Sequence, residues 1–181
     1  MGSALHCTTL FFSGCFQLSN LLIENGVDVD AQGGFYESAL QAAASKGDKS
    51  IVQLLLDHGA EVNTKGGMYG SALQAAAISR DKSMVQLLLD RGAEINRKGG
   101  TYGSALEIAV ANFWPEIVQL LLSQGALLDL PIEKWEVFLD RTRKSLDKEN
   151  VQCLRYFQEN QEEWFARSQK AWRKSESTSD A

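Results

Sequence analysis

Two patterns of apolar residues alternate along the first two-thirds of the chain. One is a run of small residues over 72–77, which predicts a short helix that neighbouring helices can pack closely. The other places Val85 and Leu88 on one face of a second helix over residues 83–91. The pattern therefore predicts pairs of short helices joined by a turn.

The residues at the predicted helix ends agree with this reading. Ser71 precedes the first helix and can accept a hydrogen bond from its first turn. Gly92 follows the second helix, where a left-handed conformation is favoured. Gly99 and Gly100 then provide the permissive backbone of a tight turn to the next pair.

This helix pair recurs with a period of 33 residues. Residues 33–65, 66–98 and 99–131 form consecutive blocks, and the first two agree at 24 of 33 positions. A degenerate earlier copy occupies residues 1–32. One pair cannot cover its own apolar surface, so the copies are expected to stack and share a continuous core.

The period ends after residue 131, and the sequence then predicts two longer helices. They cover about residues 132–143 and 147–172, and we expect residues 132–174 to form a helical cap on the last repeat. Phe113 and Trp114 are candidates to receive this cap. Residues 175–181 are small and polar, and we expect them to be disordered.

The repeated motifs resemble those of ankyrin repeats. They are the S-A-L-Q-A-A sequence at 38–43 and 71–76, and V-Q-L-L-L-x-x-G-A-x-[VI]-N at 52–63 and 85–96. The resemblance implies an all-α solenoid of about four helix-turn-helix units. The Gly-Gly-x-Tyr turns, which replace the family's usual Asp-Gly, are similar to those of fungal arrays attached to NACHT-type signalling ATPases.

Composition limits the function classes. The net charge is −5, with no basic cluster suited to nucleic acid and no apolar run long enough for a membrane span. The three cysteines are odd in number and widely spaced, which favours free thiols in the cytoplasm. The residues form no recognisable catalytic, phosphate-binding or metal-binding set, so we expect a monomeric, non-enzymatic protein without cofactor or metal.

The resemblance implies that the chain binds another protein through its turn tips and first helices, on the concave face of the stack. Tyrosines recur one unit apart in the turns and suit either packing between units or anchoring of a partner. Positions that differ between copies are further candidates for recognition. The predicted partner-binding residues are Phe35, Tyr36, Glu37, Met68, Tyr69, Thr101 and Tyr102.

Three alternatives stay open. Trp164, Phe165 and Trp172 could anchor a partner on the last predicted helix instead of packing in a core. The chain could also be a regulatory or spacer part of a larger signalling protein with no ligand of its own. Asn63 and Asn96 match a slot that an asparagine hydroxylase modifies in ankyrin repeats, although a side-chain hydrogen bond that stabilises the turn is the favoured explanation.

Overall fold

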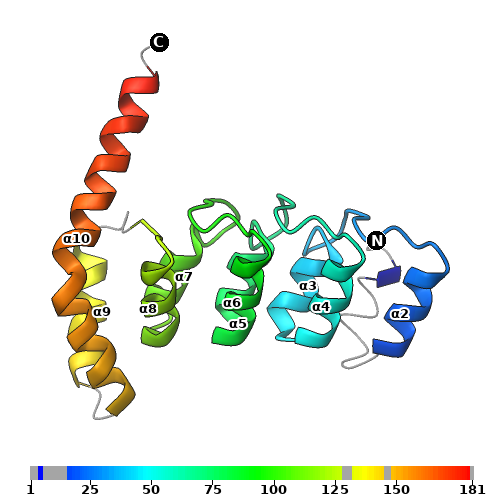
Figure 1. Cartoon of the computed structure of the whole chain (residues 1–181), viewed down its shortest axis with the longest axis horizontal. Coiled ribbons are helices and arrows are strands. Elements are labelled where there is room, and N and C mark those ends of the chain that lie inside the picture. Colours follow the sequence, from blue (N-terminus) through cyan, green and yellow to red (C-terminus); the bar gives the residue numbers. More distant parts are fainter. Residues whose placement is uncertain (1–3, 6–15, 128–131, 145–147, 180–181) are drawn as a thin grey trace. The chain divides into compact units, whose positions relative to one another are not determined.

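The computed structural model describes residues 4–5, 16–127, 132–144 and 148–179, and the regular elements in these ranges are helices (Figure 1). The chain divides into two compact units, unit 1 (Met1–Ile108) and unit 2 (Ala109–Ala181). The helices are α2 (Phe16–Glu24), α3 (Ala39–Lys46), α4 (Lys49–Asp57), α5 (Ala72–Ser79), α6 (Lys82–Asp90), α7 (Ala105–Ala111), α8 (Pro115–Ser123), α9 (Ile132–Lys144) and α10 (Lys148–Ser179).

The helix pairs predicted for the last three repeats are present, and in each of these repeats a serine caps the first helix. The Oγ of Ser38 accepts a hydrogen bond from the Gln41 N–H at 3.2 Å, and the Oγ of Ser71 accepts one from Gln74 at 3.3 Å. Ser104 accepts the same bond from Glu107 at 3.1 Å. Each serine satisfies one N–H that the first helical turn leaves without a partner.

Helices α4 and α6 each begin after an aspartate, a signal that the sequence analysis did not use, whereas α8 begins after Trp114 without a side-chain cap. The Asp48 carboxylate accepts a hydrogen bond from the Ile51 N–H, and the Asp81 carboxylate accepts bonds from the N–H groups of Ser83 and Met84. Burial opposes ionisation of Asp81, but the hydrogen bonds from Ser83 and Met84 outweigh it and lower the pKa of this carboxyl.

The two helices of a pair meet at a residue in the left-handed conformation. Gly47, Arg80 and Phe113 occupy this position in successive copies, with φ angles of 74°, 60° and 59°. The angle is unstrained for glycine and strained for the other two residues. Backbone geometry therefore limits which residues this position can carry without strain.

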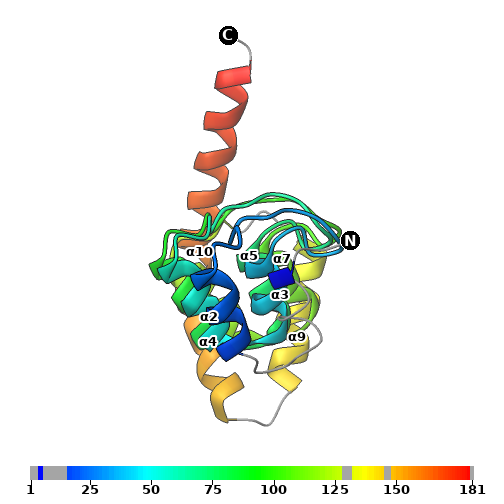
Figure 2. The same ribbon diagram turned by 90° about the vertical axis from the view of Figure 1, so that its right-hand side faces the viewer.

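The core of unit 1 is built from small residues on the first helices and larger ones on the second. Ala42, Ala43 and Ala75 are fully buried, and this lack of bulk lets α3 and α5 pack closely. Figure 2 shows α3 and α5 on one side of unit 1 and α2 and α4 on the other.

In unit 2, α9 and α10 pack together and α10 lies against α8. The rings of Trp135, Phe138 and Phe157 contact one another with centroids 5.2–5.7 Å apart, and all three side chains are buried. Phe113 stacks on Phe138, and the Arg141 guanidinium lies 3.8 Å from the Phe113 ring centre. Phe113 thus receives α9, as the sequence predicts.

The division into compact units falls at Ile108, because α8 of the last repeat packs with α10 inside unit 2. The predicted end of the repeats at residue 131 stays a prediction. Helix α10 also continues to Ser179, so residues 175–179, which we expected to be disordered, are helical. Residues 180–181 lie outside the described part of the chain.

Candidate partner-binding surface

The turns that connect the repeats of unit 1 are bonded to one another through their backbones. The Met68 N–H donates a hydrogen bond to the Phe35 carbonyl at 3.0 Å, and the Thr101 N–H donates one to the Met68 carbonyl at 2.9 Å. Three successive turns therefore form one continuous edge. This edge carries all seven partner-binding residues that the sequence predicts.

Glycines in these turns are required by close approach as well as by conformation. Gly67 has a φ of 64°, and a Cβ atom there would lie 2.7 Å from the carbonyl carbon of Tyr36. A Cβ atom on Gly100 would meet the carbonyl group of Tyr69 in the same way. The Gly-Gly pair therefore lets each turn sit directly on the one before it.

The aromatic residues of the turns form a continuous row, which we call the aromatic row: Phe35, Tyr36, Tyr69 and Tyr102. The ring centroids of Tyr36 and Tyr69 are 5.6 Å apart, and those of Tyr69 and Tyr102 are 6.0 Å apart with the rings stacked. Phe35 packs edge-on against Tyr36 at 5.0 Å. Burial and the neighbouring tyrosines raise the pKa of Tyr69 above its usual value.

The aromatic row packs between repeats and is also accessible to solvent. Phe35 is 58% exposed and Tyr102 is 43% exposed, whereas Tyr36 and Tyr69 are half-buried. Met68 is half-buried next to the row, and Thr101 is exposed. Both interpretations of the tyrosines are compatible with this arrangement, because one face of the row packs while another stays open.

Glu37 differs from the other predicted residues because its backbone is strained. Its φ angle is 67°, at a position that Gly70 and Gly103 occupy in the next two copies. Its side chain lies against Gly66, where an added Cβ would come within 2.8 Å of the Glu37 Cγ. The carboxylate is therefore held beside the turn and is half-buried.

Two buried glutamines, which the sequence reading did not single out, hold the turns in place. The Gln41 Nε2 donates a hydrogen bond to the Thr64 carbonyl at 3.1 Å. The Gln74 Nε2 donates to the carbonyls of Gly99, at 3.0 Å, and Gly103. Glutamine recurs at the same position of the S-A-L-Q motif, and this recurrence was the available sequence signal for its role. The carbonyl groups that it bonds, however, lie 23–29 residues further along the chain.

Asn63 joins its own repeat to the next one. Its Nδ2 donates a hydrogen bond to the Gly92 carbonyl at 3.0 Å, and its Oδ1 accepts one from the Glu94 N–H at 2.9 Å. Asp30 fills the same position one copy earlier and accepts from the Glu61 N–H at 2.8 Å. These bonds explain Asn63 structurally, and hydroxylation of Asn63 and Asn96 stays a prediction.

The structure removes Trp164 from the alternative aromatic site on α10. Trp164 is 2% exposed and packs against Tyr156 and Phe157, with ring centroids 5.5 and 6.1 Å away. It is a core residue of unit 2 and not an accessible anchor. Phe165 is half-buried, and the side chain of Trp172 lies outside the described residues.

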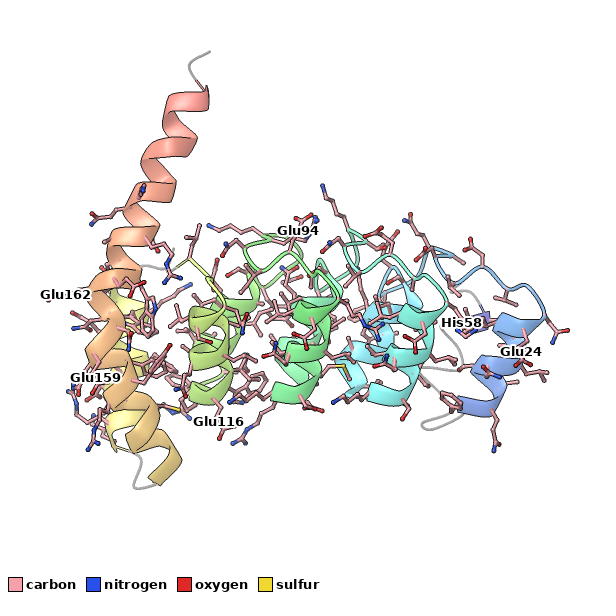
Figure 3. The ribbon with its side chains drawn as sticks, viewed as in Figure 1. Glu24, His58, Glu94, Glu116, Glu159 and Glu162 are labelled. Carbon is pink, nitrogen blue, oxygen red and sulfur yellow. The ribbon has the colours of Figure 1, made fainter. Side chains whose placement is uncertain are left out.

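The described residues show few polar side chains arranged as in a catalytic or metal-binding site. His58 lies at the C-terminal end of α4, where its Nδ1 is 2.9 Å from the Leu54 carbonyl oxygen (Figure 3). In the ranges that the structure covers, no group of three or more His, Cys, Asp or Glu residues is placed to hold a metal ion. Within the same ranges, no helix is both long and apolar enough to cross a membrane.

A family model of ankyrin repeats in three copies matches residues 5–99, which is just over half of the chain. The chain belongs to the ankyrin-repeat family. Such repeats are generally protein–protein interaction modules and are typically not enzymes. A search of curated proteins found no match.

Proposed function

We propose that the chain is a non-catalytic module that binds a partner protein on the concave face of its repeats. The binding surface comprises the aromatic row together with Glu37, Met68 and Thr101. The observation that carries the proposal is the large exposed fraction of the Phe35 and Tyr102 side chains. Both belong to the aromatic row, whose rings pack against one another between repeats. Exposed aromatic side chains are the commonest anchors of protein interfaces.

Preorganisation of the turns supports this function. The backbone bonds from Met68 to Phe35 and from Thr101 to Met68 fix the turns before any partner arrives. The buried side-chain amides of Gln41 and Gln74 also hold the turns, through hydrogen bonds to backbone carbonyls. A rigid surface loses little conformational entropy on binding, so more of the contact energy appears as affinity.

The test is a comparison of partner capture by the wild-type chain and by a Phe35→Ala/Met68→Ala double variant. Loss of an anchor side chain costs about 2 kcal/mol, or roughly 30-fold in affinity. Val137→Ala is the matched control, because Val137 is 59% exposed but lies on α9. A partner that binds the double variant as tightly as the wild type would exclude these residues from the site.

A Phe165→Ala variant separates the proposed surface from the aromatic helix. Of the two members of the alternative set whose side chains the structure describes, Phe165 is half-buried and Trp164 is buried, so Phe165 is the more accessible. We expect Phe165→Ala to retain the partner. Loss of binding in this variant alone, with helicity unchanged, would move recognition to α10.

We also infer a cytoplasmic location and a kinship with fungal NACHT-associated arrays. The odd number of widely spaced cysteines supports the first, because reduced thiols are typical of that compartment. The Gly-Gly-x-Tyr turns support the second. A fluorescent fusion of the chain tests the location, and its exclusion from the cytoplasm would contradict the proposal.

A further inference from the structure

Glu37 has a backbone conformation that favours glycine. Its φ angle is 67°, and Gly70 and Gly103 fill the same position in the next two copies. Glycine at this position would relieve the left-handed strain, so the repeat fold itself gains nothing from a glutamate. Strain that a fold does not need is typical of residues that serve a function.

The carboxylate of Glu37 has no partner among the described residues. Its side chain lies against Gly66 and is half-buried, and no hydrogen bond or ion pair within the described part of the chain engages its oxygens. Lys65, next to Gly66 in the sequence, is exposed and forms no ion pair with it. A carboxylate that is partly removed from water and left unpaired is a strong acceptor for a charged donor from another molecule.

An exposed aromatic ring lies in the same turn as this carboxylate. Phe35, two residues before Glu37, is 58% exposed, and Met68 takes its position in the next copy. The Phe35 ring meets those of Tyr36 and Tyr69 at interplanar angles of 71° and 89°. These contacts are edge-on, so neither tyrosine stacks on Phe35. The face of an exposed aromatic ring attracts a guanidinium or ammonium group.

We propose that the turn at residues 33–37 binds an arginine side chain of the partner protein, with the guanidinium against the ring of Phe35 and paired with the carboxylate of Glu37. The inference rests on the proposed function and adds the chemistry of the segment that the surface recognises. Arginine matches both groups at once, because its planar guanidinium donates two parallel hydrogen bonds to a carboxylate and also stacks on aromatic rings. The next two turns carry neither a ring nor a carboxylate at these two positions, so the arginine is assigned to the first turn alone.

The first experiment selects random peptides displayed on phage for binding to the immobilised full chain, beside the Phe35→Ala/Met68→Ala double variant and Glu37→Gly. We expect the peptides that bind the wild type and not the double variant to be enriched in arginine at one position. Glu37→Gly should still select peptides but lose this enrichment. Peptides that depend on Phe35 and Met68 but show no enrichment in arginine would overturn the arginine site and leave the proposed function standing. A selection without any such peptides would contradict both.

A double-mutant cycle then tests the ion pair directly. The strongest selected peptide is titrated against the wild type and Glu37→Gln, and again with its arginine replaced by citrulline, which keeps the shape of the side chain and removes its charge. We expect each single change to weaken binding about tenfold, and both changes together to weaken it little further. Independent effects of the two changes, or binding of Glu37→Gln as tight as that of the wild type, would overturn the proposal.

Glu24→Gln is the matched control for this cycle. It removes the same charge from an exposed position on α2, outside the turns (Figure 3). We expect it to bind the peptide as the wild type does. An equal loss in Glu24→Gln and Glu37→Gln would show that only the overall charge of the chain matters, and would also overturn the proposal.

Thermal unfolding separates recognition from a structural role of Glu37. Glu37→Gly removes a strained conformation, so we expect the variant to be at least as stable as the wild type while it loses arginine-dependent binding. A variant less stable than the wild type would show that the glutamate serves the fold, and the proposal would fail.

Discussion

The side-chain amide of Gln41 donates a hydrogen bond to the carbonyl oxygen of Thr64 at 3.1 Å, from a position that is fully buried. Gln74 repeats this relationship one copy later, with Gly99 and Gly103 as acceptors. The first helix of one repeat thereby holds the turn of the next. Continuity of the turns is a property of neighbouring repeats and not of a single one.

Replacing Gln74 with leucine should destabilise the protein by about 2 kcal/mol, because the half-buried carbonyls of Gly99 and Gly103 lose their donor. The measurement is urea unfolding followed by circular dichroism. Gln86→Leu is the control, since Gln86 bonds only to the exposed carboxylate of Asp90 in its own helix. Equal stability of the two variants would contradict a role for Gln74 in holding the turn.

Gly67 and Gly92 separate close approach from backbone strain. Both have positive φ angles, 64° and 85°, but a Cβ on Gly92 would meet nothing within 4 Å. Gly92→Ala should therefore cost only the left-handed strain, about 1 kcal/mol. Gly67→Ala should cost roughly 3 kcal/mol, because its Cβ also overlaps the backbone of Tyr36.

Thermal and urea unfolding of the two alanine variants check this difference. Gly67→Ala should also disturb the near-ultraviolet signal of the stacked tyrosines, since the turn must shift away from Tyr36. If both variants lose the same stability, close approach adds nothing to the requirement for glycine.

Gly47 and Arg80 occupy the same position in consecutive repeats, at the turn between the two helices. Arg80→Gly should stabilise the protein by about 1 kcal/mol, because it relieves left-handed strain at a φ of 60°. Gly47→Ala should destabilise it by a similar amount, since only Ser79 lies near the added Cβ, at 3.8 Å. Changes of the same sign in the two variants would refute this account.

The features predicted from the sequence were local or periodic. Ser71 and Gly92 reveal the helix ends by residue type alone, and the period of 33 residues gives the order of the helix pairs. The match to the ankyrin-repeat family confirms ankyrin repeats over residues 5–99 and the all-α fold, and the boundaries of the four predicted repeats stay predictions.

The features that the sequence reading missed depend on tertiary placement. The bonds of Gln74 reach residues far along the chain, and the left-handed angle of Arg80 is not typical of arginine. Trp164 has the same side chain whether it anchors a partner or fills a core, and only its burial beside the rings of Tyr156 and Phe157 decides. The partner-binding residues were placed by resemblance, and their binding stays a prediction.

The pH dependence of stability tests the cap of α6. The pKa of Asp81 is lowered in the folded protein from its ordinary value of 3.8, because hydrogen bonds from Ser83 and Met84 to the carboxylate outweigh burial. A group with a depressed folded pKa contributes stability above its unfolded pKa and loses that contribution as the pH falls through the folded value.

Asp81→Asn retains a capping oxygen but cannot ionise. We therefore expect the wild type to exceed Asp81→Asn in free energy of unfolding above about pH 4, with the difference shrinking below pH 3.8. Urea unfolding of both proteins across this range is the measurement, and a difference that does not change with pH would show that the charge of Asp81 does not stabilise the helix.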